Sequence, residues 1–355
     1  MTATDESPPR LTATPDTCFW GYFDPALEPV LTVDSGTVVE IEAITHHSGD
    51  APDLLMDEGI QAIWDGIPVE TRTPGVHIMT GPIAVAGAGP GDALVVEILD
   101  MWPRLRHGAN CAAHWGALYK DFQKERITIY ELDGPNTIAG PGYSRFPPTA
   151  TPIFGFDFTE RELYDQPGVI SPPERNPREP FSRDVAVPVR PHLGVMGVAP
   201  PGDARLDSVP PGVFGGNVDN WRFGPGAKIR YPIFHEGAGF YVGDPHFAQG
   251  DGEICGTAIE ASLDVRLRLS VEPGAAPGAP LLESDGLIFT HGFGTDLDEA
   301  MLAAAREMVA LVQNRFGLTA DEAYSLASVA IDLGITQVVD GTVGCHASID
   351  PAIFL

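Results

Sequence analysis

The sequence predicts a mainly β fold, arranged in β-sandwich or barrel-like layers with a C-terminal helical pair inserted, and therefore α+β overall. Short β-type runs bounded by turn residues recur along most of the chain. The 40 glycines and 34 prolines among 355 residues separate these runs. After residue 296 the apolar period changes from two to 3.6, which indicates helices.

The first half of the chain divides into three expected parts. Residues 1–29 form a polar, Pro-rich N-terminal arm. Residues 30–142 form a β-rich N-terminal domain with runs such as TVVEIEAI and ALVVEILDM. Residues 143–184 carry many prolines, which disfavour long helices and central strands. We therefore expect an irregular excursion or lid there.

The second half is expected to hold a β-rich catalytic core over 185–270, with the runs AKIRYPIFHEG, GFYVGD and TAIEASLDVRLRLSV. Residues 271–355 are expected to contain a linker, VEPGAAPGAPLL, then the helical pair and a closing strand.

Capping signals place the two helices. Asp296 can cap the segment LDEAMLAAAREMVALVQNRF, and Gly317 follows it as a C-terminal stop. Thr319 with Glu322 repeats the capping signature before AYSLASVAIDLG. The second helix is expected to end at Gly334.

Composition argues against several classes of partner. The formal net charge of −28 disfavours a nucleic acid, because binding one relies on Lys and Arg. No apolar run approaches the roughly 18 to 20 residues of a membrane span, and the polar start does not resemble a secretion signal. The cysteines at 18, 111, 255 and 345 lack CxxC spacing. We expect a cytoplasmic protein with no nucleic-acid or membrane partner.

The stretch GDPHFAQGDGE, residues 243–253, carries the strongest functional signal. Pro245 is expected to hold Asp244 in an extended conformation, so that Asp244 and His246 point to one side. Asp251 and Glu253 have the same spacing, and the glycines between the pairs allow a sharp turn. Carboxylates brought together in this way require a proton or a cation between them. A solvated polar turn is the alternative.

Two further motifs contribute candidates. In PPGVFGGNVDN, Gly216 permits close backbone approach to a ligand, while Asn217 and Asp219 offer oxygen atoms on one side. The alternative there is a hairpin turn. His192 follows the run DVAVPV, where a structural role is the alternative. Cys255 could be a thiol nucleophile, but its apolar surroundings and the acidic loop beside it favour a packed core residue.

Four segments together resemble the acetamidase/formamidase family: TGPIAVAGAGPGDALVVEILD at 80–100, GGNVDN at 215–220, GDPHFAQGDGEICGTAIE at 243–260, and DLDEAM with GLTADEAYSLASVAIDLGITQVVD near the end. The resemblance implies hydrolysis of a short linear amide, such as acetamide or formamide, to a carboxylate and ammonia. It also implies a β-rich fold and an oligomer, for which we expect a homodimer. The matching site positions are Asn217, Asp219, Asp244, His246, Asp251 and Glu253.

An amidase needs an activated water, a stabilised oxyanion and a proton for the leaving nitrogen. A divalent metal ion held by Asp219, Asp244 and His246 could supply the first two. Zn²⁺ is the expected ion, with Mn²⁺ and Ca²⁺ as alternatives. Glu253 is the expected proton shuttle.

Other residues complete the expected site. Asp251 and His246 are expected to join Glu253 in catalysis, while Asn217, Gly216 and His192 contact the substrate. Two other functions stay open: an amidase that uses the Cys255 thiol, and a calcium-stabilised β-sandwich binding module without chemistry.

Overall fold

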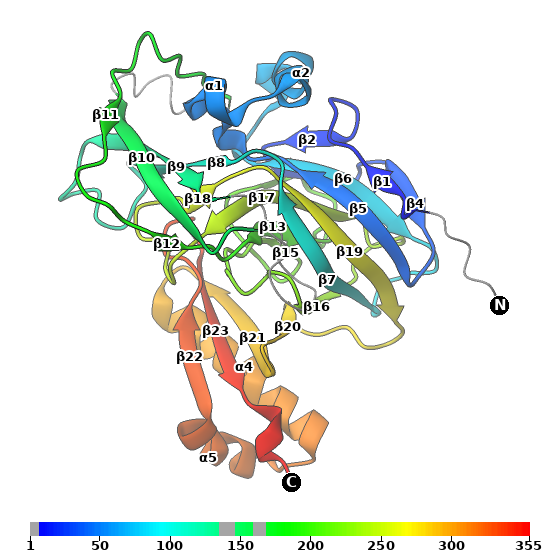
Figure 1. The fold of residues 1–355 in the computed structure, drawn as a ribbon. Coiled ribbons are helices and arrows are strands. Elements are labelled where there is room, and N and C mark those ends of the chain that lie inside the picture. The colour runs from blue at the N-terminus through cyan, green and yellow to red at the C-terminus, as the bar shows by residue number, and fades with distance from the viewer. Residues whose placement is uncertain (1–6, 135–145, 159–167) are drawn as a thin grey trace.

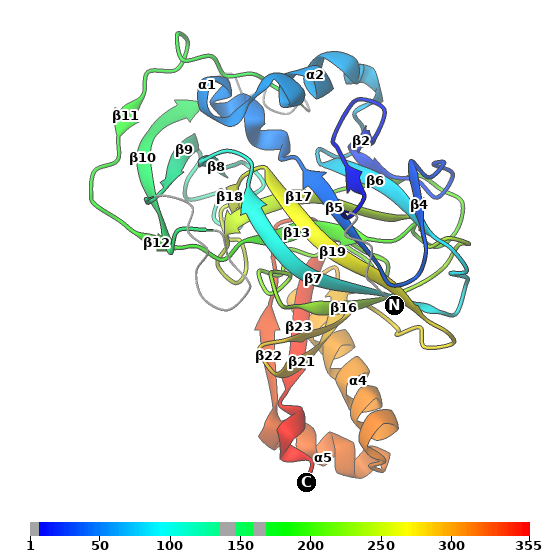
Figure 2. The ribbon, with the colours of Figure 1, turned by 45° about the vertical axis from the view of Figure 1, so that its right-hand side comes forward.

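The computed structural model describes residues 7–134, 146–158 and 168–355. Two large β-sheets form the body, and a C-terminal part that carries two helices projects from it (Figures 1 and 2). The mainly β, α+β prediction is confirmed. Within these residues no helix is both long enough and apolar enough to cross a membrane.

The first sheet runs from the N-terminal part of the body into the C-terminal projection. It has nine strands, in the order β1 (Arg10–Leu11), β5 (Thr37–Ala43), β19 (Leu263–Glu272), β7 (Ala93–Pro103), β16 (Lys228–Pro232), β20 (Leu281–Ser284), β21 (Leu287–Gly294), β23 (Val343–Ile349) and β22 (Ile331–Ile335). Strands from distant parts of the sequence thus alternate in one sheet.

The second sheet holds the strands that position the site. Its main path is β11 (Glu179–Pro180), β10 (Thr149–Phe158), β9 (Glu125–Leu132), β8 (His107–Ala112), β18 (Ile259–Glu260), β17 (Phe240–Ala248), β13 (His192–Gly197) and β15 (Gly215–Asn217). β6 (Ile78–Val85) pairs with β17 and also with β2 (Cys18–Trp20) and β4 (Leu31–Val33), while β12 (Val187–Pro188) pairs with β10. A separate two-stranded sheet joins β3 (Tyr22–Phe23) and β14 (Leu206–Asp207).

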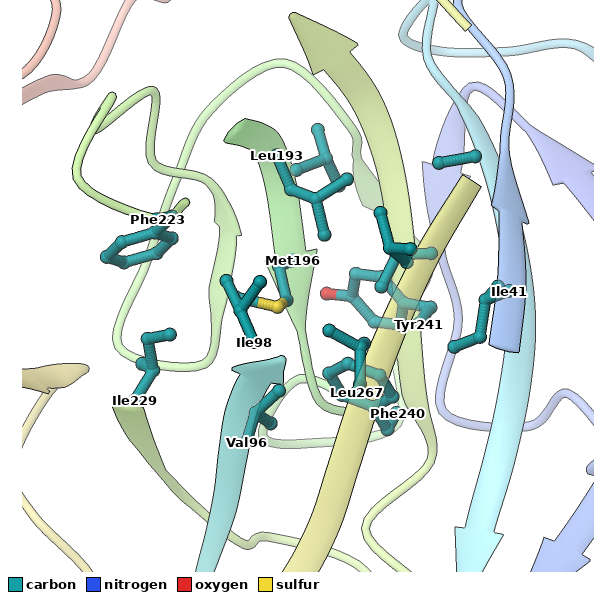
Figure 3. Close-up of a cluster of buried hydrophobic side chains, with 14 of the residues drawn as sticks. Ile41, Val96, Ile98, Leu193, Met196, Phe223, Ile229, Phe240, Tyr241 and Leu267 are labelled. Carbon is teal, nitrogen blue, oxygen red and sulfur yellow. The ribbon is translucent and has the colours of Figure 1, made fainter. Parts of the chain in front are cut away.

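The hydrophobic core lies between the two sheets (Figure 3). Alternating residues of β5, β7 and β19 meet residues of β13 and β17 there, which is how period-two strands bury one face. The side chains labelled in Figure 3 are Ile41, Val96, Ile98, Leu193, Met196, Phe223, Ile229, Phe240, Tyr241 and Leu267. This core gives the central strands of the second sheet a rigid support.

Short helices cover the edge of the body above β5 and β6 (Figure 2). They are the 3₁₀ helices η1 (His46–Asp50) and η2 (Val69–Thr71) and the α-helices α1 (Pro52–Leu55) and α2 (Glu58–Gly66). Buried Ile60, Ile63 and Trp64 of α2 pack with Trp20 and Ile44. This cluster fixes η1, and with it the His46–His47 pair.

The helical pair forms as its capping signals predict. Asp296 caps α4 (Leu297–Phe316) by accepting from the amide of Glu299, and Gly317 ends it in the left-handed conformation. Thr319 and Glu322 form a capping box on α5 (Ala320–Ala330). α4 packs on β21 and β23 through an apolar face that includes Ala300, Ala304 and Met308. A 3₁₀ turn, η3 (Pro351–Ile353), closes the chain.

The second helix is shorter than predicted. It ends at Ala330, and residues 331–335 form the edge strand β22 instead of a last helical turn. Gly334 lies opposite His346 in β23, and a side chain at 334 would collide with the His346 ring. The glycine therefore permits strand pairing at this point and is not a helix stop.

Residues 149–158 also differ from the expected irregular segment over 143–184. They form β10, which pairs with β9 from Ala150 to Phe158. The register shifts between Pro152 and Phe154, and such a bulge tolerates the missing N–H of proline. Of the expected excursion, residues 143–145 and 159–167 lie outside the described part of the chain.

Substitution of Gly292 on β21 tests how closely α4 packs against the sheet. A Cβ there would overlap the backbone of Ala300 and Ala304, so Gly292→Ala must push the helix outward. Overpacking of this kind typically costs about 1–3 kcal/mol, and urea unfolding should show a loss of that size. Gly89→Ala is the matched control, because its Cβ would meet its nearest neighbour, the Glu236 carboxylate, at an ordinary 3.4 Å. Equal stability of the two variants would contradict the close packing.

Candidate active site

A cavity of about 220 Å³ opens where β17, β18, η1 and the turn after β15 meet. It is smaller than the roughly 300–1,000 Å³ typical of sites for drug-sized ligands. Its walls combine carboxylates, histidines and a few apolar groups, namely His46, His47, Val76, His77, Trp115, Val209, Asn217, Asp219, Asp244, Glu253, Gly256, Thr257, Glu260, Val339 and Asp340. The space suits a ligand of a few atoms.

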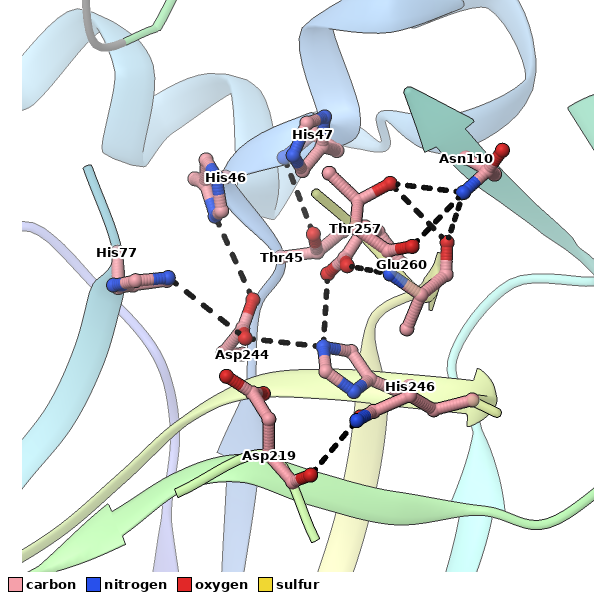
Figure 4. A network of polar contacts seen from close by, with 12 residues as sticks. Thr45, His46, His47, His77, Asn110, Asp219, Asp244, His246, Thr257 and Glu260 are labelled. Carbon is pink, nitrogen blue, oxygen red and sulfur yellow. Dashed lines mark hydrogen bonds and ion pairs between the residues drawn. The ribbon is translucent and has the colours of Figure 1, made fainter. Parts of the chain in front are cut away.

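Asp244 and His246 lie inside β17 and not in a loop, which starts only after Ala248. Asp244 is not extended as the following proline predicts, because its φ is 47°. It lies between two regular pairings with β13, Gly243 with Val195 and Pro245 with Leu193. At that point the side chain turns towards the histidines around the cavity (Figure 4).

Three histidines surround the Asp244 carboxylate (Figure 4). Its oxygen atoms lie 3.0 Å from His246 Nε2, 3.6 Å from His46 Nδ1 and 3.8 Å from His77 Nε2. Burial alone would raise the pKa of Asp244, but His246 and His77 lower it well below its ordinary value. Burial lowers the pKa values of His46 and His77, so both are neutral near pH 7 and available as ligands.

His246 lies fully buried under the cavity floor, between two carboxylates. Its Nε2 is 3.0 Å from Asp244 and 3.1 Å from Glu260, and Nδ1 is 2.9 Å from His192 Nε2. Burial opposes the charge, but Glu260 and Asp244 raise the pKa of His246 well above its ordinary value. Without a metal ion, His246 is therefore an imidazolium that donates from both ring nitrogens.

His192 supports His246 and does not line the cavity. Burial and the neighbouring His246 charge lower the pKa of His192 to about 3, so the ring is neutral. Its Nδ1 lies 2.7 Å from the carbonyl oxygen of Arg190, and its Nε2 lies 2.9 Å from His246 Nδ1 and 3.0 Å from Gln249 Oε1. This arrangement fixes which nitrogen of His246 faces the carboxylates.

Gly216 and Asp251 also lie outside the cavity. The missing side chain of Gly216 makes room for Phe23 and Phe214 in the core. Asp251 is half exposed and accepts from Trp221 Nε1 at 2.8 Å and from Arg222 at 3.1 Å. The structure thus brings Asn217, Asp219, Asp244 and Glu253 together on the cavity wall, with His246 beneath them.

Gly194 on β13 is the point where three predicted residues converge. A Cβ on Gly194 would lie 2.5 Å from Asp219 Oδ1, 2.6 Å from Asp244 Oδ2 and 2.6 Å from His246 Cε1. Its carbonyl oxygen also accepts from the amides of Val218 and Asp219, at 3.0 and 3.2 Å. Gly194 therefore leaves the space for the cluster and holds the turn that carries Asp219.

Three cavity acids have left-handed backbones. The φ angles are 50° at Asp219, 47° at Asp244 and 48° at Glu253, out of five positive φ values at non-glycine residues in the described ranges. Each such residue costs about 1–3 kcal/mol and persists only where its surroundings enforce it. Their concentration around one cavity indicates that their orientation serves a function and not stability.

The cavity carboxylates favour protonation when no cation is present. Burial and the Asp244 charge raise the pKa of Asp219 to about 7. Burial and Asp219 raise the pKa values of Glu253 and Asp340 well above their ordinary range. The cost of crowding these acids is thus met by retained protons and by the His246 charge.

The donor set fits a divalent cation. Asp219 Oδ1 and Asp244 Oδ1 are buried and accept no hydrogen bond from the described residues. Three groups place their ligand atoms within 4.8 Å of one another: Asp219, His246 and Glu253; Asp244, His246 and Glu260; and His46, His77 and Asp244. Carboxylate oxygens mixed with imidazoles are typical ligands of zinc and manganese.

Sequence reasoning did not assign His46, His77, Glu260 or Asp340 to the site. No motif in the sequence marks His46 or His77, and only the fold shows that they meet at Asp244. Glu260 has a feature that the sequence does show, because it is an acid between the apolar residues Ile259 and Ala261. In the structure Glu260 is buried and lies opposite His246 in the pairing of β18 with β17. A buried acid within a strand requires such a partner.

Cys255 does not line the cavity. Its Sγ accepts from Asn110 Nδ2 at 3.2 Å. The expected packed core position is wrong, because Cys255 is only partly buried and Ile254 is 55% exposed in the turn before β18. The residue instead lines a separate pocket with Leu118, Phe122 and Ile254.

A small cavity with buried acids and neutral histidines, held between strands of a mainly β fold, defines a small-molecule site suited to a metal ion. The sequence matches the Acetamidase/Formamidase family over residues 11–205 and 202–354. The chain therefore belongs to this family.

Proteins with similar sequences or structures are named acetamidase or formamidase. The chain is 34% identical over 218 residues to an acetamidase from Mycolicibacterium smegmatis, covering 52% of this chain and 50% of that protein. It is 31% identical over 229 residues to a formamidase from Methylophilus methylotrophus, covering 55% and 52%. The match thus spans about half the length of these relatives. A crystal structure of an acetamidase from Bacillus halodurans aligns over 97% of this chain and 98% of its own, with 26% identity and a TM-score of 0.73.

Substitution of Gly194 tests the assembled cluster. Gly194→Ala forces a methyl group against Asp219, Asp244 and His246, so these side chains must separate. We expect affinity for Zn²⁺ or Mn²⁺, measured by calorimetry, to fall by at least the roughly 10–100-fold typical of lost supporting contacts. Gly250→Ala is the control, since its Cβ would meet nothing within 4 Å. Unchanged metal affinity in folded Gly194→Ala protein would refute the role of Gly194.

The raised pKa values predict that metal-free protein loses stability from pH 7 to pH 9. Burial opposes protonation of His47, but Asp50, 2.8 Å away, raises its pKa to about 9. Its contribution is complete below the unfolded pKa of 6.5 and is lost as the pH rises through about 9. Glu253 and Asp340 act in the same direction, because their raised pKa values let the folded state keep protons that the unfolded state has released.

Urea unfolding in EDTA at several pH values between 7 and 9 measures this dependence. Histidines with lowered pKa values are neutral in the folded state, and in the unfolded state they keep a partial charge only near pH 7, so their opposing effect is small beside that of His47, Glu253 and Asp340. Glu253→Gln removes one titrating group and should reduce the slope. A free energy of unfolding that increases between pH 7 and pH 9 would contradict the assignment.

Proposed function

We propose that this protein is an amidohydrolase that cleaves the C–N bond of a short linear amide, giving a carboxylate and ammonia. The observation that carries the proposal is the small cavity with Asp219, Asp244 and Glu253 on its wall. Family membership and the similar proteins named acetamidase and formamidase support it.

The proposed metal ligands are Asp219, Asp244 and His246, with Zn²⁺ as the expected ion. A bound divalent ion would polarise the amide carbonyl and make a water more acidic. For His246 to act as a ligand, its Nε2 must release the proton that it shares with Asp244 and Glu260. His192 keeps Nδ1 engaged, so Nε2 stays directed at the carboxylates.

Glu253 is the proposed proton shuttle. It lines the cavity, and burial together with the neighbouring Asp219 raises its pKa well above the ordinary value in the metal-free protein. A bound cation would favour the ionised form of Glu253, which can take a proton from the attacking water and then give that proton to the leaving nitrogen. Both transfers need the side chain to face the substrate, and Glu253 is on the cavity wall.

Asn217 is proposed to orient the substrate. Its Nδ2 donates to Val209 O and to Asp340 Oδ2, both at 3.1 Å, which fixes the amide plane. Its Oδ1 is buried and accepts no hydrogen bond from the described residues, so it can accept an N–H of the substrate amide.

Two further parts of the proposal come from the sequence. The scattered cysteines, without disulfide or zinc spacing, favour a cytoplasmic enzyme. The family resemblance favours a homodimer.

Replacement of Glu253 tests the shuttle. Glu253→Gln keeps the shape of the side chain but cannot release a proton, so turnover of acetamide and formamide should fall by about 100-fold or more. Metal content, measured by mass spectrometry of the purified protein, should stay at the wild-type level. Ammonia release reports the activity, and EDTA should abolish it in the wild type.

Cys255→Ala is the matched control and should keep full activity, because Cys255 lies off the cavity. Wild-type turnover in Glu253→Gln would remove Glu253 from the mechanism. Loss of activity in Cys255→Ala, with Glu253→Gln unaffected, would favour a thiol mechanism instead.

A further inference from the structure

We propose that Gln249 is a positioning residue, whose side-chain amide fastens together the three segments that carry Asp219, Glu253 and Asp340. The inference rests on the proposed function and adds a residue to it. Gln249 belongs to the GDPHFAQGDGE stretch, but it does not line the cavity and has no part in the chemistry described above. Its side chain is nevertheless buried in the protein.

The three segments meet at the Gln249 amide. Gln249 begins the loop that follows β17 and leads to Glu253. Its Nε2 donates to the carbonyl oxygen of Asp219 at 2.7 Å and to that of Thr336 at 3.3 Å. Thr336 follows β22 and leads to Asp340. Because the two oxygens belong to different segments, a single NH₂ group sets how these segments lie relative to the Glu253 loop.

The surroundings allow the amide one orientation. Two carbonyl oxygens face its NH₂ group, so a rotated amide would bring Oε1 against both of them without a proton between. Oε1 therefore points the other way and lies 3.0 Å from His192 Nε2, the nitrogen that also contacts His246. Gln249 thus contacts the support of one proposed metal ligand, His246, and the backbone of another, Asp219.

Asp219 needs this contact because its backbone is left-handed, with a φ of 50°. Gly194 accepts from the Asp219 amide at 3.2 Å on one side, and Gln249 donates to the Asp219 carbonyl oxygen on the other. A residue in this conformation persists only where its surroundings enforce it. Both peptide groups of Asp219 are held, and with them the direction of its carboxylate.

The Asp219 turn keeps other contacts when Gln249 is replaced. Asn220 Nδ2 lies 3.0 Å from His291 Nε2 on β21, and the Gly252 amide donates to the Thr336 carbonyl oxygen at 2.9 Å. Loss of the Gln249 amide should therefore loosen Asp219 without detaching the C-terminal projection from the body. The expected defect is one of orientation and not of folding.

Replacement of Gln249 by methionine tests this role. Gln249→Met keeps the length of the side chain but has no amide to contact Asp219, Thr336 or His192. We expect Zn²⁺ affinity, measured by calorimetry, to fall by about 10–100-fold. At saturating Zn²⁺, kcat for acetamide should fall by about tenfold or more while KM stays within about twofold, because Gln249 does not touch the substrate.

Gln61→Met is the matched control for this substitution. Gln61 Nε2 donates to Asp65 Oδ1 at 3.0 Å in an exposed contact on α2, away from the cavity. Metal affinity, kcat and KM should all stay at the wild-type level in this variant. A loss of stability in urea with wild-type metal affinity and kcat in Gln249→Met would make Gln249 a purely structural residue and overturn the proposal.

Hydrogen exchange measures the hold on Asp219 without hydrolysis. In metal-free Gln249→Met, the amides of Val218 and Asp219, which donate to the Gly194 carbonyl oxygen, should exchange about fivefold faster than in the wild type or more. The amides of β19 should exchange as slowly as in the wild type, which shows that the variant is folded.

The two measurements separate this inference from the proposed function. Wild-type exchange at Val218 and Asp219, with wild-type kcat, would overturn the role of Gln249 and leave the proposed hydrolysis intact. Faster exchange there, in a protein whose wild type releases no ammonia from acetamide or formamide, would refute the proposed hydrolysis and support the hold of Gln249 on Asp219.

Discussion

The burial of several carboxylates in one small cavity is the constraint on which the rest of the structure depends. Asp219, Asp244 and Glu260 are each at most 4% exposed, and such charges are costly unless they are compensated. Without a metal ion, the protein compensates them with retained protons and with the imidazolium of His246. A divalent cation could replace these protons and leave the same side chains as ligands. The proposed metal-assisted hydrolysis thus follows from the need to compensate the buried carboxylates.

The fold keeps these acids in place by strand pairing. β13 and β17 lie side by side in the second sheet, and the lack of a side chain at Gly194 leaves room for Asp219, Asp244 and His246 to meet. The positive φ angles at three acids are maintained by this support. The projecting part contributes as well, because Gly252 donates to the Thr336 carbonyl at 2.9 Å and Asp340 lines the cavity.

Local signals predicted much of the fold and the chemical character of the site. Period-two runs predicted the strands, and Asp296 and Gly317 predicted both ends of α4, because capping depends on neighbouring residues. The convergence of Asp219, Asp244 and Glu253 was also predicted. The sequence did not reveal that Asp251 faces solvent, because i, i+2 spacing assumes a regular backbone. Nor did it show that His46 and His77 meet at Asp244, since sheet pairing brings them there.

The central claim is that the buried acids around His246 hold a divalent cation. Anomalous diffraction from crystals grown with Zn²⁺, collected on both sides of the zinc absorption edge, tests it most directly. We predict an anomalous peak within bonding distance of Asp219, Asp244 and His246. A cavity that contains only water at saturating Zn²⁺, with His246 still in contact with both Asp244 and Glu260, would contradict the claim.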